Sequence, residues 1–129
     1  LIAAESAKFA DTHGKWGMTP TWGMSQRLPR RIGVLMAKEI MFTGRVVTGE
    51  ESLRLGLANR CVPDEELDNA AIAMAQTITE NAWFTLRTEK SLIREGQNLH
   101  LSDALSYERK HSPGAGPDMA ERLKQFSKK

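Results

Sequence analysis

The most informative stretch of the sequence runs from residue 42 to residue 63 and reads FTGRVVTGEESLRLGLANRCVP. Its run Arg45-Val46-Val47 predicts a short strand. Thr48 and Glu51 then form a Thr-x-x-Glu capping box, which predicts that a helix begins after Thr48. Gly56 stands where a left-handed residue commonly ends a helix. A short strand that leads directly into a short capped helix is the expected local structure.

The chain ahead of this stretch combines extended segments, a loop and two helices. Residues 1–4 and 8–10 have the composition of short strands separated by a polar turn, and the sequence shows no partner strand for either. The following segment, residues 12–23, is broken four times, by Gly14, Gly17, Pro20 and Gly23. This density of breakers predicts a loop without regular structure, and such loops often carry function. Helices are expected over residues 21–31 and 34–42.

The chain downstream of this stretch is helical by pattern. Asp64 is the expected N-cap of a helix with an apolar stripe formed by Leu67, Ala71, Met74, Ala75 and Ile78. Further helices are expected over residues 82–95, 102–110 and 118–126. The sequence therefore predicts two regions: residues 1–63, with strands, a glycine-rich loop and helices, and residues 64–129, which are helical.

Composition excludes several classes of protein. Among 129 residues, 40% are hydrophobic and 26% are charged, which is typical of a globular chain. No apolar run approaches the roughly 20 residues that span a bilayer, so no membrane partner is expected. The single cysteine, Cys61, forms no intrachain disulfide, and with no evident signal peptide a cytoplasmic location is expected. A net charge of +2, without aromatic residues between the basic ones, argues against a nucleic-acid partner.

Signatures of several enzyme classes are missing from the sequence. It contains no Gly-x-Ser-x-Gly elbow, no Gly-x-x-x-x-Gly-Lys-Ser/Thr loop and no Gly-x-Gly-x-x-Gly fingerprint, which argues against triad hydrolases, P-loop proteins and dinucleotide enzymes. The three histidines lack the spacing of a metal site, so no metal is expected. Only His13 lies in the glycine-rich loop, where it is either a surface side chain or a proton carrier.

Motifs in order over residues 1–63 resemble the enoyl-CoA hydratase/isomerase, or crotonase, family. Phe9 and Gly17 match the family's Phe-x-x-Pro-Glu-x-x-x-Gly, and Pro20 and Gly23 match its next glycine-rich segment. The remaining matches are Gln26-Arg27-Leu28, Phe42-Thr43-Gly44, Gly56-Leu57-Ala58-Asn59 and Val62-Pro63. The resemblance implies an α/β crotonase (ClpP/crotonase-like) fold, here the last strands of its spiral core and its mainly α-helical C-terminal trimerisation region.

The resemblance also implies a chemistry. Family members stabilise the enolate of an acyl-CoA thioester with two backbone N–H groups. The resemblance places both donors, and the first catalytic glutamate, ahead of Leu1, so the 129 residues alone are expected to be inactive. The complete protein is expected to be a lyase or isomerase of fatty acid or related acyl-CoA metabolism, and to form a trimer or a dimer of trimers. Coenzyme A enters as part of the substrate, and no bound cofactor is expected.

His13 stands where the family has its second catalytic glutamate, after Thr12 in place of a proline. Histidine can move a proton but cannot reproduce two carboxylates around a water, and because one base suffices in isomerase-like members, the sequence favours a supporting role. The expected substrate-binding residues are Thr12, Trp16, Gly17, Thr21 and Trp22. The two indoles either fill the core or narrow the acyl pocket.

Basic residues near the C-terminus are the expected ligands of the CoA phosphate. Arg122 and Lys124 lie on the last expected helix, with Lys128 and Lys129 after it, and a solvated surface is the alternative reading. Two other functions stay open: an inactive crotonase homologue or assembly module that lacks the catalytic half, and a small basic binding module unrelated to the family. The sequence ahead of Leu1 would distinguish the enzyme from the module.

Overall fold

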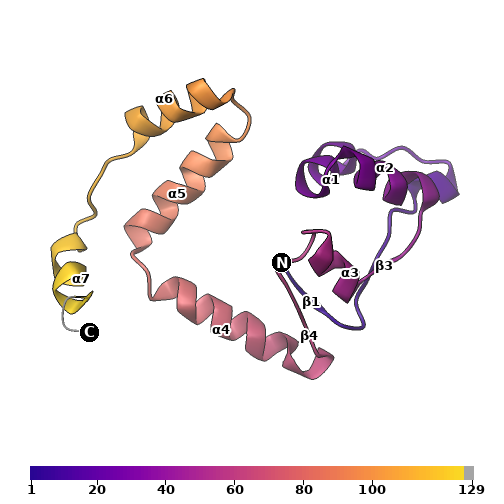
Figure 1. Cartoon of the computed structure of the whole chain (residues 1–129), viewed down its shortest axis with the longest axis horizontal. Coiled ribbons are helices and arrows are strands. Elements are labelled where there is room, and N and C mark those ends of the chain that lie inside the picture. The colour runs from indigo at the N-terminus through magenta and orange to yellow at the C-terminus, as the bar shows by residue number, and fades with distance from the viewer. Residues whose placement is uncertain (127–129) are drawn as a thin grey trace. The chain divides into compact units, whose positions relative to one another are not determined.

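The computed structural model of the chain describes residues 1–126 and divides it into two compact units, Leu1–Met74 and Ala75–Lys129 (Figure 1). The boundary lies within helix α4 (Leu67–Thr79), later than the division expected after residue 63. α4 runs without a break across this boundary. The role of residues 64–129 as an oligomerisation region stays a prediction.

Four short strands in the first unit form two pairs. β1 (Ile2–Ala4) pairs in parallel with β4 (Arg60–Val62), and β2 (Lys8–Phe9) pairs antiparallel with β3 (Val47–Thr48). The expectation that the first two strands lack partners is therefore wrong. Each partner lies far along the chain, and β4 was missed because a three-residue strand carries almost no periodic signal.

The helical elements of the first unit follow the expected order. They are η1 (His13–Trp16), α1 (Met24–Ile32), α2 (Val34–Thr43), α3 (Gly49–Arg54) and η2 (Asp64–Glu66). The capping prediction is confirmed, because Thr48 Oγ1 accepts the backbone N–H of Glu51 at 3.2 Å. Two predictions need correction: the loop over residues 12–23 contains the 3₁₀ turn η1, and α1 begins after Gly23, which has a φ of 90°.

The core of the first unit is small and built from closely approaching elements. Its buried apolar side chains are Ala3, Ala37, Ile40, Val47 and Ala58. Arg45 links two helices at the edge of this core, with Nε 2.7 Å from Glu39 on α2 and Nη2 2.8 Å from Glu51 on α3. Because the buried side chains are mostly small, the backbones of these elements can approach one another closely.

Asp64 does not cap a helix as expected. Its carboxylate accepts hydrogen bonds from the backbone N–H and the hydroxyl of Ser6, in the turn after β1. Asp64 is instead the first residue of η2, which leads into α4. The carboxylate thus fixes the turn after β1 to the chain segment after β4, a contact between residues 58 positions apart.

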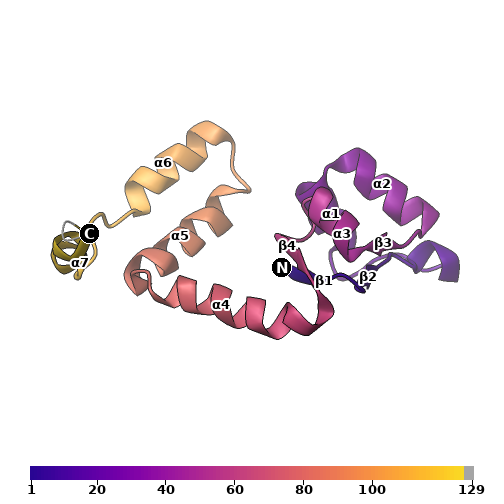
Figure 2. The ribbon, with the colours of Figure 1, turned by 60° about the horizontal axis from the view of Figure 1, so that its bottom comes forward.

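All regular secondary structure in the described part of the second unit is helical. α5 (Trp83–Gly96) and α6 (Leu101–His111) lie side by side, as both views show, and α7 (Met119–Phe126) follows an extended linker (Figure 2). These helices confirm the three expected ones to within about a residue at most ends. Within residues 1–126, no helix is long and apolar enough to cross a membrane.

Candidate active site

A carboxylate and an imidazole meet at the start of η1. Asp11 is buried, with 3% of its surface exposed, and follows β2. Its Oδ1 accepts the backbone N–H of His13 at 3.0 Å and lies 2.5 Å from Nδ1 of the same residue. An aspartate that binds the backbone two residues further on forms an Asx turn, which starts the 3₁₀ turn locally. The same oxygen therefore shapes the backbone and contacts the ring.

The charges of this pair are set by their surroundings. Burial raises the pKa of Asp11, but the hydrogen bonds from the backbone and ring of His13, with the charge of His13, lower that pKa by more, so the net shift is downward. Asp11 is therefore ionised at neutral pH and can only accept hydrogen bonds. Nδ1 is the nitrogen of the His13 ring that faces this carboxylate.

The end of α2 supports the loop that carries this pair. Gly44 ends α2 with a φ of 58°, and a Cβ at this position would lie 3.1 Å from the Asp11 carbonyl oxygen and 2.8 Å from Cε of Lys15. A side chain would thus need both a left-handed backbone and space that the loop already fills. The glycine of the Phe42-Thr43-Gly44 motif allows α2 to end directly against the Asp11–His13 segment.

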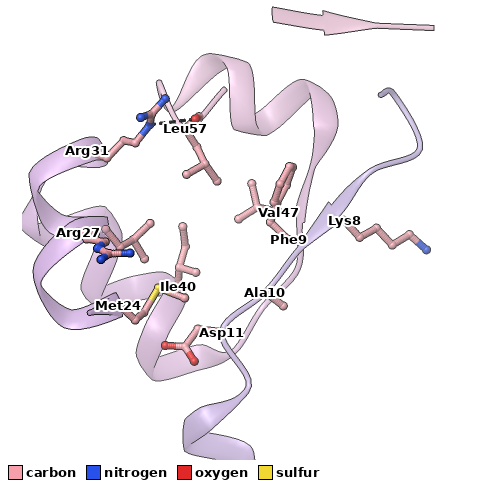
Figure 3. A pocket seen from close by; sticks show the side chains of 11 residues that line it. Lys8, Phe9, Ala10, Asp11, Met24, Arg27, Arg31, Ile40, Val47 and Leu57 are labelled. Carbon is pink, nitrogen blue, oxygen red and sulfur yellow. Dashed lines mark hydrogen bonds between the residues drawn. The ribbon is translucent and has the colours of Figure 1, made fainter. Parts of the chain in front are cut away.

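A cavity of about 470 Å³ lies between α1, α2 and the β2–β3 pair (Figure 3). Its lining residues are mainly apolar: Lys8, Phe9, Ala10, Asp11, Met24, Arg27, Leu28, Arg31, Ile40, Val47 and Leu57. At one side of the cavity, Arg31 Nε donates to the Leu57 carbonyl oxygen at 3.1 Å. Asp11 belongs to this lining and His13 does not.

The expected substrate-binding residues lie outside this cavity. Thr12 joins the η1 turn, where its carbonyl oxygen accepts the backbone N–H of Lys15. Trp16 and Trp22 are 72% and 86% exposed, so neither indole fills the core of the described unit. The structure brings Thr12, Trp16 and Gly17 to the same turn as His13, whereas Thr21 and Trp22 precede α1. Their contact with a substrate stays a prediction.

The expected phosphate ligands lie on α7. Arg122 is already engaged within the second unit: Nε donates to Asp118 Oδ2 at 2.5 Å and Nη1 donates to the Glu80 carbonyl oxygen at 2.9 Å. Lys124 lies on the same helix. Lys128 and Lys129 fall outside the described residues. Arg122 therefore has a structural task besides any contact with a ligand.

Reasoning from the sequence singled out His13 but missed Asp11. The sequence signal that indicates a role for Asp11 is the spacing Asp-x-His just after a strand. An aspartate carboxylate can accept the backbone N–H of the residue two positions later. The cavity lining was also missed, because it joins residues from five separate segments. Within residues 1–126, no cluster of three or more His, Cys, Asp or Glu side chains could hold a metal ion.

Short paired strands, closely packed helices and a buried aspartate bonded to a partly exposed histidine form part of an α/β fold. A family model described as enoyl-CoA hydratase/isomerase matches residues 1–126. The chain belongs to the enoyl-CoA hydratase/isomerase family. Its fold is a portion of the crotonase fold, since it overlays a crystal structure of enoyl-CoA hydratase from Bacillus anthracis with a TM-score of 0.94 at 36% sequence identity.

Relatives in other organisms are about twice as long. The chain is 38% identical over its whole length to a probable enoyl-CoA hydratase, echA8, of Mycobacterium bovis, and covers 51% of that protein. It is 36% identical over 87% of its length to a probable peroxisomal enoyl-CoA hydratase of Arabidopsis thaliana, of which it covers 42%. The Bacillus anthracis overlay spans 98% of this chain and 50% of that one. The chain thus spans about half the length of the relatives it matches.

Proposed function

We propose that this chain is the C-terminal half of an acyl-CoA enzyme of the enoyl-CoA hydratase/isomerase type. The order of its motifs supports this half, because the glutamate-bearing Phe-x-x-Pro-Glu pattern falls at Phe9 and helices alone follow Asp64. The names of its relatives support chemistry on a CoA thioester. Fatty acid or related acyl-CoA metabolism is the proposed context, and a cytoplasmic location stays a prediction.

The observation that carries this proposal is the Asp11–His13 pair, whose histidine the family resemblance aligns with the second catalytic glutamate. A histidine whose Nδ1 faces a buried carboxylate is arranged like the general base of many enzymes. The pairing favours a proton-carrying role for His13 over the supporting role that the sequence favours. The enolate-stabilising N–H groups and the first glutamate would come from the other half of the enzyme.

Substrate and assembly follow from the same proposal. The acyl chain would pass the η1 turn at Thr12, Trp16 and Gly17 and the segment with Thr21 and Trp22, and the CoA phosphate would meet Arg122 or Lys124. Exposed large apolar side chains, including Trp22, Leu35 and Phe42, would be covered by the other half or by other subunits of a trimer. Analytical ultracentrifugation of the 129-residue polypeptide is expected to show concentration-dependent association. A stable monomer with a concentration-independent melt would contradict this.

The proposed function is tested on the complete protein that contains these residues. It is expected to add water to a short-chain 2-enoyl-CoA or to shift the double bond of a 3-enoyl-CoA, followed by the absorbance of the conjugated thioester. Calorimetry with a non-reacting saturated acyl-CoA measures binding in parallel. Binding of the acyl-CoA without turnover of either substrate would instead favour the inactive homologue. Absence of both binding and turnover would refute the proposal.

A further inference from the structure

We propose that Asp11 is a positioning residue that holds His13 in the Nδ1–H tautomer, so that Nε2 is the atom that exchanges a proton with the substrate. This inference rests on the proposed function of the site. It concerns a side chain that touches no substrate in this arrangement, because Asp11 acts through the imidazole. His13 is the group that would move the proton.

Two contacts between Asp11 and His13 support this inference. Oδ1 of Asp11 receives both the backbone N–H of His13, at 3.0 Å, and the ring Nδ1, at 2.5 Å. Two bonds to one residue fix the position of the backbone and the rotation of the ring together. A neutral imidazole otherwise has two tautomers, and the partner of one nitrogen decides which of them is present.

The burial of the Asp11 side chain also supports this inference. Asp11 has 3% of its surface exposed, whereas the His13 side chain is 25% exposed. Within residues 1–126, the hydrogen bond of the His13 ring is made by Nδ1. The carboxylate is therefore the more buried partner of the pair, and Nε2 is the ring nitrogen that the described residues leave without a hydrogen bond. Water competes little for the carboxylate, which strengthens its hold on the ring.

The proton balance of the step is simple. Nε2 uses its lone pair to take a proton from the substrate or from the water that adds to it, and the donor keeps the electrons of the broken bond. The ring becomes an imidazolium with both nitrogens protonated, and its charge faces the Asp11 carboxylate. Return of the same proton from Nε2 to the product restores the neutral ring, so no further reactant is consumed.

A purely structural role for Asp11 is the alternative, because an Asx turn alone explains the bond to the backbone. Asp64 provides a matched control: its carboxylate also accepts a backbone N–H and a side-chain donor, both from Ser6, but no histidine is involved. If each carboxylate only stabilises its turn, Asp11→Asn and Asp64→Asn should each weaken their own turn and leave the His13 tautomer unchanged. If Asp11 also controls the tautomer, Asp11→Asn alone should change it.

The experiment uses the complete protein with ¹⁵N-labelled histidine, and the His13 signals are assigned by their loss in His13→Ala. NMR is expected to show neutral His13 mainly as the Nδ1–H tautomer in the unsubstituted protein and in Asp64→Asn, and a shift towards Nε2–H in Asp11→Asn. We expect Asp11→Asn to lower kcat by about a hundredfold or more with little change in KM. The double variant Asp11→Asn/His13→Ala is expected to match His13→Ala within about twofold, because both changes act on one group.

Three results would overturn the inference: a neutral His13 mainly in the Nε2–H form in the unsubstituted protein, an unchanged tautomer in Asp11→Asn, or losses that multiply in the double variant. The first measurement needs no variant, so a folding defect of Asp11→Asn does not remove the test. If the complete protein turns over no CoA thioester, the proposed function fails, and the NMR measurement still decides whether Asp11 sets the tautomer.

Discussion

Gly49 lies directly against the backbone of Ala4. A Cβ atom at position 49 would stand 2.1 Å from the Ala4 carbonyl oxygen and 3.2 Å from Sγ of Cys61. Gly49 is the first residue of α3 and is buried against Ala4 of β1 and Cys61 of β4. The capped helix can therefore begin on the β1–β4 pair only because this residue has no side chain.

Gly49→Ala is expected to destabilise the first unit. The added methyl group meets backbone on one side, so β1 or α3 must move, and overpacking of this kind costs about 1–3 kcal/mol. Urea unfolding followed by circular dichroism measures the change in the free energy of unfolding. Gly14→Ala is the control, because a Cβ there would lie 3.7 Å from the nearest atom, the Met41 carbonyl oxygen. Equal stability of both variants would contradict the close approach.

Local signals in the sequence were sufficient for the helices and insufficient for the pairing of strands. Thr48 and Gly56 mark the ends of α3 because caps depend on neighbours within a turn. The pairing of Ala3 with Cys61 and the contact of Ser6 with Asp64 join residues 58 positions apart, and two or three residues per strand give no pattern that specifies a partner. Of the site, the sequence indicated His13 through its loop and its place in a family motif, whereas the burial of Asp11 depends on where α2 ends.

Arg45 makes the stability of the first unit sensitive to acid. The hydrogen bond from the Arg45 side chain lowers the pKa of Glu51 below the ordinary range of glutamate, although desolvation opposes the shift. A lowered folded-state pKa gives stability that is present above the unfolded pKa, about 4.3, and is lost as the pH falls through the folded pKa. We expect Arg45→Met to lower the free energy of unfolding at pH 7 and to flatten its decline below about pH 4.

The control for Arg45 is Arg54→Met, because the charge of Arg54 lowers the pKa of Glu51 by less than the hydrogen bond from Arg45 does. Arg54 pairs with Glu50 one turn away on α3, and both side chains are largely exposed, at 66% and 76%. Exposed pairs of this kind contribute little to stability. Urea titrations at pH 7 and pH 3 would separate the two variants, and an identical pH dependence in both would refute the role of Arg45.

Charge reversal at either of two positions on α7 is expected to weaken ligand binding. Lys124→Glu should weaken acyl-CoA binding in the complete protein by opposing the phosphate. Arg122→Glu should weaken binding and also speed hydrogen exchange of α7 amides, because it removes the bonds to Asp118 and Glu80. Calorimetry at low salt and hydrogen exchange measure the two effects. Unchanged affinity in both variants would leave these residues as solvated surface.

Histidine, glutamine and glutamate at position 13 are expected to give different activities in the complete protein. His13→Gln keeps a hydrogen-bonding side chain but cannot titrate, so kcat for enoyl-CoA hydration is expected to fall by about a hundredfold or more. His13→Glu puts back the carboxylate of the family motif and is expected to hydrate faster than His13→Gln. His100→Gln is the control, since His100 is exposed and lies at the start of α6.

The pH profile tells a base from a residue that only shapes the pocket. If Nε2 accepts the proton, kcat/KM of the unsubstituted protein falls as the pH is lowered, because a protonated imidazole has no lone pair to accept the proton. In His13→Glu that fall should move towards pH 4 to 5, because a carboxylate remains a base to lower pH. An activity that rises as the pH drops would assign His13 as the acid instead. Full turnover in His13→Gln, with a profile like that of the unsubstituted protein, would show that the imidazole moves no proton.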